Sequence, residues 1–214
     1  MLILIEQAAD PSLKTYLTQA KKDLEKNKIK SINELFERYP DLRDVATDAT
    51  EQQCYRSKNY DQQKKYYSGK SKQHAIKTQI SVSSTDRIID VSNSYPGSVH
   101  DKAIIDQEKT VEKIPDHVPH RFDSGYQGVK KEHPEKYLIL PIKKPRSREL
   151  NSLEKEHNKA NSKRRVVSEH RFAQIKKFRI CSGVYRQPLD TYNQTFRNIA
   201  ALINFRQQFS SVTA

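Results

Sequence analysis

The order of strand-like and helix-like segments is the feature that most constrains how this chain can fold. Three β-type segments come early: one at residues 43–52, then two at 74–84 and 86–97 that a short turn joins. The later segments are predicted as a helix at 98–108, strands at 118–128 and 137–144, one long helix or two consecutive helices at 148–179, and a helix at 189–209. Strands interrupted by helices indicate a mixed sheet with helices packed on it, an α/β fold.

The two ends of the chain set the predicted domain boundaries. Residues 1–40 are predicted as a helical arm, residues 41–209 as the main domain and residues 210–214 as a tail. Ser31 and Glu34 have the spacing of a capping box, and Pro40 ends the arm. The closing helix has one apolar stripe, which predicts packing against the core. This stripe consists of Tyr192, Phe196, Ile199 and Ile203.

The chain is strongly basic, with 39 Lys and Arg residues against 26 Asp and Glu residues and a net charge of +13 at pH 7. The excess is concentrated in residues 143–179 and in residues 55–77, where tyrosines are interleaved with lysines. A solvated helix face and a solvated loop would explain either segment alone. Both together favour DNA, because lysines neutralise phosphates and tyrosines stack on bases or bind sugars.

Nothing in the sequence indicates a membrane or an oxidising compartment. The amino-terminal run MLILI is too short for a signal-peptide core or a spanning helix. Two cysteines, Cys54 and Cys181, form no disulfide framework. We therefore expect a cytoplasmic protein in a reducing compartment.

Glu169 is the single acidic residue in the basic segment KRRVVSEHRFAQIKKFR, residues 163–179. A surface salt bridge is the simplest explanation. In a helix, however, Arg165 lies about 40° and Lys176 about 20° from Glu169 around the axis, so the three form one polar stripe. The residues predicted to anchor this helix to the sheet lie beside the stripe: Phe172, Ile175 and Phe178.

Two aspartates lie where strands are predicted to end, Asp48 in VATDAT and Asp123 in HRFDSGY. Taken singly, each is most simply a turn residue whose carboxylate binds backbone amides. Together with Glu169 they could converge on divalent metal, since carboxylate oxygens suit Mg²⁺ or Mn²⁺. Two such ions would activate the attacking water or 3′-hydroxyl and stabilise the leaving oxygen. Metal binding would then explain why a basic helix carries a single carboxylate.

Other familiar site patterns are incomplete. Gly69-Lys70-Ser71 resembles the end of a phosphate loop but lacks the earlier glycine, and no dinucleotide fingerprint is present. His117 and His120 have a metal-ligand spacing, but no further Cys or His supports it, so a surface turn is the simpler interpretation.

Several stretches resemble the bacterial insertion-sequence transposases of the DDE group, in the branch related to Harbinger elements. They occur in that family's order: DATEQ, YYSGKSKQHAIK, NSYPGSVHDKAI, FDSGYQG and R-x3-E-x6-K, followed by NIAALINFR. The resemblance covers about residues 42–205. It implies an RNase H-like fold and a metal-dependent nuclease and strand-transfer activity, with Mg²⁺ or Mn²⁺, two ions in all, as the cofactor.

The resemblance also assigns residues. The acidic triad of the family falls on Asp48, Asp123 and Glu169, and its basic residues around the last acid fall on Arg165 and Lys176. Three positions depart from the family pattern: Ala49 in place of glycine, Phe122 in place of an acid or polar residue, and Ser162 in place of tyrosine.

Further residues are predicted to bind DNA or assist. The predicted DNA contacts are Lys70, Lys72, His74, Arg165 and Lys176. His100 and Asp101 match a family motif and are possible auxiliary residues, although Ser98 and Asp101 also have the spacing of a capping box.

The predicted function is that of a transposase catalytic domain acting on double-stranded DNA. The chain is too short at its amino terminus for the family's helix-turn-helix module. We therefore expect a truncated copy or the second frame of a split gene, with a separate helix-turn-helix chain as a partner. The resemblance implies a homo-oligomer on DNA at the bacterial nucleoid. Two alternatives remain open: a DNA-binding protein that no longer cuts, and an RNase H-like nuclease for branched or RNA-containing substrates.

Overall fold

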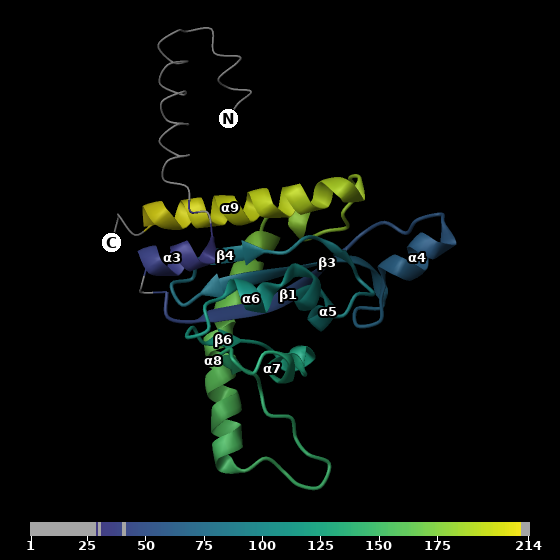
Figure 1. Cartoon of the computed structure of the whole chain (residues 1–214). Helices are drawn as coiled ribbons and strands as arrows, with labels where there is room; N and C mark the ends of the chain where they lie inside the picture. The colour runs from purple at the N-terminus through teal and green to yellow at the C-terminus, as the bar shows by residue number, and fades with distance from the viewer. Residues whose placement is uncertain (1–28, 30, 40–41, 211–214) are drawn as a thin grey trace, which may run out of the picture.

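The computed structural model describes residue 29, residues 31–39 and residues 42–210 (Figure 1). The strands are β1 (Val45–Gln53), β2 (Tyr67–Ser68), β3 (Gln73–Ser83), β4 (Ile88–Val91), β5 (Tyr95–Pro96), β6 (His120–Arg121) and β7 (Leu138–Ile139). The α-helices are α3 (Ile32–Arg38), α4 (Tyr60–Tyr66), α5 (Asp101–Glu108), α6 (Thr110–Lys113), α7 (Val129–Glu132), α8 (Ser152–Lys176) and α9 (Tyr192–Ser210). Three 3₁₀ turns complete the described part: η1 (Ser124–Tyr126), η2 (Arg179–Cys181) and η3 (Leu189–Thr191).

The sheet has the predicted mixed topology, with β1 at its centre. Strand β1 pairs antiparallel with β3 on one edge and parallel with β6 on the other, and β6 pairs parallel with β7. Strands β4 and β5 pair antiparallel with β3. The strands follow one another across the sheet in the order β4-β3-β1-β6-β7, and β3 runs antiparallel to both of its neighbours. This is the arrangement of an RNase H-like sheet. The predicted fold class is therefore confirmed.

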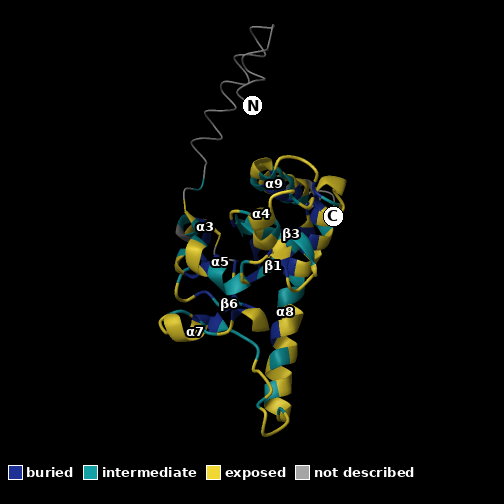
Figure 2. Cartoon of the chain, turned by 90° about the vertical axis from the view of Figure 1, so that its right-hand side faces the viewer, coloured by how far each residue is buried: buried dark blue, intermediate teal, exposed yellow. Residues whose placement is uncertain are grey.

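Helices cover both faces of this sheet. On one face the side chains of the central strands are apolar, and on the other face they form hydrogen bonds. Ile76, Ile80 and Val82 of β3 pack with residues of α8 and α9 in one buried cluster. Gln79 points the opposite way and donates hydrogen bonds to the Asp101 carbonyl at the start of α5 (2.6 Å) and to the Tyr126 hydroxyl (3.1 Å). The two faces thus receive different helices, in agreement with the views in Figures 1 and 2.

Most of the predicted elements are present. The strands expected at 43–52 and 74–84 are β1 and β3. The helical segment expected at 148–179 is a single helix, α8 (Ser152–Lys176), with a complete capping box between Asn151 and Glu154. Of the predicted apolar stripe on α9, Tyr192, Phe196 and Ile203 are buried and Ile199 packs against them. That stripe is confirmed as core.

Several details differ from the prediction. The strand expected before the turn in 118–128 and the strand expected at 137–144 shrink to the two-residue strands β6 and β7. Residues 60–66, for which no element is predicted, form α4, because Asn59 caps the helix by accepting a hydrogen bond from the Gln62 amide. Phe178 follows the end of α8 and is 38% exposed, so it does not anchor the helix as Phe172 and Ile175 do.

The amino-terminal region is described only in part. The expected helix over residues 11–30 lies outside the described residues apart from Ile29. In the described part, α3 begins at the predicted cap, where the Ser31 hydroxyl accepts a hydrogen bond from the Glu34 amide (3.1 Å). Leu35 and Phe36 pack against Val45 of β1. Within the described residues, no helix is both long and apolar enough to cross a membrane.

Helix α8 should depend on Ile175 for its attachment to the sheet. Ile175 is fully buried, so Ile175→Ala leaves a cavity and should lower the free energy of unfolding by about 2–5 kcal/mol in urea titrations. Leu153 lies on the same helix but is 74% exposed, and Leu153→Ala should change it by about 0.5 kcal/mol or less. Equal effects of the two substitutions would contradict this packing.

Candidate active site

Asp48 lies in the middle of the central strand, not at a strand end as predicted. Strand β1 continues to Gln53, and Asp48 pairs with Ile80 of β3. Its side chain therefore points to the face covered by α8, where Arg165 donates a hydrogen bond from Nη2 to Oδ2 (3.2 Å). The Ala49 amide donates to Oδ1 (2.8 Å). Asp48 is therefore not a turn residue. It is a half-buried carboxylate with one guanidinium partner.

Asp123 follows β6 directly and caps η1. Its Oδ1 accepts a hydrogen bond from the Gly125 amide (2.6 Å), so the turn role considered for it is real. The parallel pairing of β1 with β6 matches Val45 with His120. Three residues further along the same register, Asp123 lies opposite Asp48 of the neighbouring strand. Two elements far apart in the sequence thus bring two carboxylates to the same level of the sheet.

The electrostatics agree with this proximity. Burial raises the pKa of Asp48 above its usual value, and the negative charges of Asp123 and Asp101 raise it further. Arg165 and the Ala49 amide act in the opposite direction without cancelling the effect. Asp48 is therefore a carboxylate whose charge the protein compensates only in part.

Asp101 belongs to a second group of charges on the other side of β1. Lys77 of β3 is buried and pairs with Asp101 (2.9 Å) and Glu51 (3.4 Å), and it donates a hydrogen bond to the Val99 carbonyl (2.8 Å). Glu51 also accepts a hydrogen bond from the Ser71 hydroxyl (2.6 Å) in the β2–β3 turn. These contacts tie the turn that carries Lys70 and Lys72 to the start of α5.

The capping box expected at Ser98 and Asp101 is not formed. Helix α5 begins at Asp101 and its cap is His100, which makes no side-chain cap hydrogen bond. The Ser98 hydroxyl instead donates to the Lys65 carbonyl (2.6 Å). This frees the Asp101 carboxylate for Lys77.

Tyr126 carries a buried hydroxyl that was not predicted from the sequence. Burial raises its pKa well above the usual range, and the charges of Asp101, Asp48 and Asp123 add to this effect. The hydroxyl thus lies within the field of all three aspartates.

The residues that sequence reasoning missed are Glu51, Lys77, Gln79 and Tyr126. A lysine inside an apolar strand, as at Lys77, is the one local signal that could have indicated them.

Glu169 lies on the helix that covers Asp48. It is one turn beyond Arg165 and is exposed, and its side chain forms no hydrogen bond or ion pair with another described side chain. Across the described residues, no three His, Cys, Asp or Glu side chains are grouped tightly enough to hold a metal ion. Asp48 and Asp123 nevertheless fit Mg²⁺ or Mn²⁺, which often bind one or two protein carboxylates and complete their shell with water and phosphate oxygens.

The predicted DNA contacts divide between two places. Lys70 and Lys72 are exposed in the β2–β3 turn, and His74 follows at the start of β3, where its ring packs edge-on against Tyr67. Lys176 is exposed at the end of α8, whereas Arg165 is occupied by Asp48. The structure therefore places Arg165 as a partner of the candidate catalytic carboxylate.

The two histidines of the metal-like pair lie in different environments, and only one is at the surface. His117 is exposed, but His120 is buried in β6, so the surface-turn interpretation is wrong for it. The His120 Nε2 is hydrogen-bonded with the Thr47 hydroxyl (2.7 Å), and burial lowers the pKa of His120 to about 3. It is a neutral residue of the sheet interior. Cys54 and Cys181 are both buried free thiols.

Comparisons with known proteins agree with this geometry. The family described as DDE superfamily endonuclease matches residues 47–204. The chain is 33% identical over 162 residues to the "Probable transposase for insertion sequence element IS702" of Microchaete diplosiphon, a match that covers 75% of this chain and 56% of that protein. The chain thus spans little more than half the length of that relative. No solved structure matches it.

The raised pKa of Asp48 predicts a pH-dependent contribution to stability. Between its unfolded value near pH 4 and the higher folded value, the folded chain binds more protons at Asp48 than the unfolded chain does. The contribution of Asp48 to the free energy of unfolding therefore decreases as the pH rises from about 4 to the folded-state pKa. Asp48→Asn removes this contribution, so the variant should gain stability relative to the wild type from pH 4 to pH 7.

Melting temperatures of both proteins across that pH range measure the difference. Asp190→Asn, at an exposed aspartate, is the matched control and should track the wild type at every pH. A difference between Asp48→Asn and wild type that does not change with pH would show that the Asp48 pKa is not raised.

Proposed function

The chain belongs to the DDE superfamily endonucleases, and we propose that it is a transposase catalytic domain that cleaves DNA phosphodiesters and joins the freed 3′-hydroxyl to target DNA. The observation that carries the proposal is the pair of carboxylates at one level of the sheet, Asp48 and Asp123, on two separate strands. The similarity to an insertion-sequence transposase supports transposition as the setting. That the chain belongs to the Harbinger-related branch stays a prediction.

The residues proposed to hold divalent metal are Asp48, Asp123 and Glu169. The metal, as one or two ions, would supply an activated water or 3′-hydroxyl and a counter-charge for the leaving oxygen. Asp48 is held rigidly by Arg165 and the Ala49 amide, so its carboxylate needs little reorganisation to bind a cation. Asp123 is fixed in the same way by the Gly125 amide. Glu169 would add the third carboxylate from a flank of α8 that is open to DNA.

The remaining residues position this centre and its substrate. Lys77 pairs with Glu51 and Asp101 on the far side of β1, and its single positive charge offsets one of their two negative charges. Lys70, Lys72 and Lys176 are exposed and would bind DNA phosphates, with His74 beside them. The same proposal includes a homo-oligomer on DNA, a separate helix-turn-helix chain that recognises element ends, and action at the bacterial nucleoid.

A protein that binds DNA without cutting it is the second candidate. It is favoured by one observation: among the described residues, no three His, Cys, Asp or Glu side chains are grouped closely enough to hold a metal ion. The two candidates predict the same salt-sensitive binding and differ only in cleavage.

Cleavage should require both metal and Asp123. We expect the purified chain to nick and join duplex DNA in Mg²⁺ or Mn²⁺ and to be inactive in EDTA. Asp123→Asn removes one proposed ligand charge and should abolish detectable cleavage while leaving salt-sensitive binding intact. Asp190→Asn should cleave like the wild type. Tight binding with no cutting in either metal would refute the nuclease for this chain and favour the second candidate.

Metal binding should also stabilise the fold without any substrate. A ligand that binds only the folded state raises stability by about 2.7 kcal/mol at 100 times its dissociation constant. Mg²⁺ or Mn²⁺ should therefore raise the melting temperature at pH 7. Because a protonated carboxylate does not bind metal, this increment should shrink as the pH falls through the titration of Asp48. It should be lost in Asp48→Asn, and an undiminished increment there would exclude Asp48 as a ligand.

A further inference from the structure

The hydroxyl group of Tyr126 is a buried donor to which the proposed reaction assigns no role. The side chain is fully buried. Its ring packs against the ring of Phe122, with 5.3 Å between the two centroids, and against Val129 and Leu138 in one apolar cluster. Close packing holds the ring in one orientation, so the hydroxyl oxygen has a fixed place in the fold. A phenylalanine would fill the same space, so packing explains the ring but not the hydroxyl.

Gln79 determines how the hydroxyl can use its hydrogen. The Gln79 Nε2 atom lies 2.6 Å from the Asp101 carbonyl oxygen and 3.1 Å from the Tyr126 hydroxyl oxygen. Because a carbonyl oxygen can only accept hydrogen bonds, the atom beside it has to be the amide nitrogen of Gln79. The same nitrogen then donates to Tyr126, whose oxygen is the acceptor. The hydrogen of the Tyr126 hydroxyl is therefore left for another acceptor.

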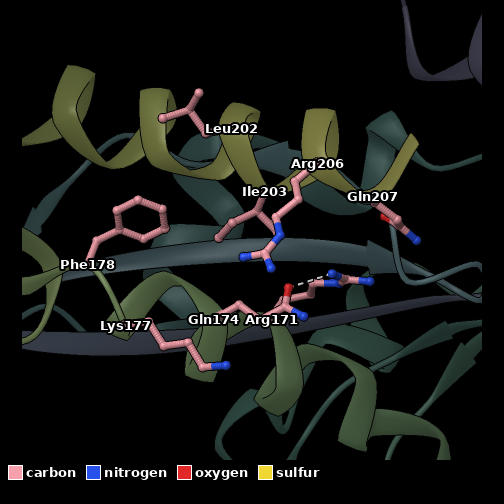
Figure 3. A pocket seen from close by; sticks show the side chains of 8 residues that line it. All are labelled: Arg171, Gln174, Lys177, Phe178, Leu202, Ile203, Arg206 and Gln207. Atoms are coloured by element: carbon pink, nitrogen blue, oxygen red, sulfur yellow. Dashed lines mark hydrogen bonds between the residues drawn. The ribbon is translucent and has the colours of Figure 1, made fainter. Parts of the chain in front are cut away.

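Within the described part of the chain, no group accepts that hydrogen. A buried donor without an acceptor costs free energy, so such a group needs an explanation. Two neighbouring cavities do not supply one. The cavity of about 440 Å³ between α8 and α9 is lined by Arg171 and Ile203 among others (Figure 3), and the cavity of about 600 Å³ beside β7 is lined by Leu138 among others. Tyr126 lines neither cavity, so its acceptor is better sought among the protein groups around it.

Carboxylates surround Tyr126. Gly125, the preceding residue, lies next to two of them: a Cβ atom at this position would lie 2.9 Å from Asp123 Oδ1 and 3.6 Å from Asp101 Oδ2. Burial raises the pKa of the Tyr126 hydroxyl well above its usual range, and the charge of Asp101 raises it further. The other two aspartates act in the same direction with smaller effects. The hydroxyl therefore keeps its hydrogen, and Asp101 is the carboxylate with the largest effect on it.

Asp101 has an oxygen that can accept this hydrogen. Its Oδ1 atom lies 2.9 Å from Lys77 Nζ. Its Oδ2 atom lies on the side of Gly125 and forms no hydrogen bond with another described residue. The backbone of Asp101 and the hydroxyl of Tyr126 already share one donor, the Gln79 nitrogen. A donor without an acceptor and an acceptor without a donor thus belong to neighbouring residues at the candidate active site.

We propose that Tyr126 is a positioning residue of the metal centre, whose hydroxyl donates to the Asp101 carboxylate and fixes it beside Asp123 when divalent metal binds. The inference rests on the proposed function, in which Asp123 is a metal ligand. Repulsion between the Asp101 and Asp123 carboxylates opposes their approach, and a cation at Asp123 offsets this repulsion. Mg²⁺ and Mn²⁺ keep several waters, for which a fixed carboxylate next to the ligand is an acceptor.

The test measures the affinity of the whole chain for Mn²⁺ without DNA, from the electron paramagnetic resonance signal of free Mn²⁺. Tyr126→Phe removes the hydroxyl and keeps the ring. Loss of a residue that orients metal ligands lowers metal affinity by about 10–100-fold, and we expect the dissociation constant to rise by this factor. In EDTA the variant should melt within about 4 °C of the wild type, because it loses a single hydrogen bond.

Tyr95→Phe is the matched control. The Tyr95 hydroxyl also donates to a carboxylate, that of Glu108 (2.6 Å), but at the other end of α5 from Asp101. This variant should bind Mn²⁺ like the wild type. Asp101→Asn should itself weaken Mn²⁺ binding. Adding Tyr126→Phe to it should then change the dissociation constant by less than about 2-fold, as expected for two residues that act through one hydrogen bond.

Equal Mn²⁺ affinities of the wild type and Tyr126→Phe would overturn the proposal. The same loss in Tyr95→Phe, or a full additional loss in the Asp101→Asn background, would also overturn it. DNA nicking separates this inference from the proposed function. A wild type that binds Mn²⁺ through Tyr126 but cuts no DNA keeps the positioning role and loses the nuclease. A wild type that cuts, beside a Tyr126→Phe variant of unchanged Mn²⁺ affinity, keeps the nuclease and loses the positioning role.

Discussion

The ion pair between Asp48 and Arg165 is the interaction on which the rest of the structure depends. Strand β1 has neighbours on both edges, so a carboxylate in its middle cannot turn to solvent and needs a cation from the covering layer. Helix α8 supplies that cation. Loss of one partner of a buried pair leaves an uncompensated charge, so the pair fixes how α8 lies over the sheet. The position of Glu169 follows from that placement.

Charge compensation is incomplete on both sides of β1, and this gives the site its negative character. Lys77 lies between Glu51 and Asp101 on one side and pairs with both. On the other side Asp48 has one guanidinium at 3.2 Å, and its pKa is still raised. A small negative centre therefore persists within a protein of net charge +13. Such a centre attracts divalent cations, while the surrounding basic surface attracts the DNA.

The long helix α8 presents different surfaces because an α-helix makes one turn in 3.6 residues. Phe172 and Ile175 attach it to the core, and Arg165, one turn before Glu169, pairs with Asp48. The amino-terminal half of α8 extends beyond the sheet and is largely exposed, as Figure 2 shows. A helix that is polar over most of its circumference is stable here because a capping box begins it and a narrow apolar stripe holds its second half.

The sequence by itself determined the order of the main elements, the apolar stripe of α9, the basic character of the surface and the identity of the candidate carboxylates. These follow from local periodicity, capping residues and short motifs. Only the tertiary structure decided that Asp48 lies mid-strand, that His120 is buried and that Lys77 joins Glu51 to Asp101. Periodicity is set by neighbours within one or two turns of the chain. Burial and ion pairing depend on residues far apart in the sequence, 117 positions for Asp48 and Arg165, and no local pattern encodes them.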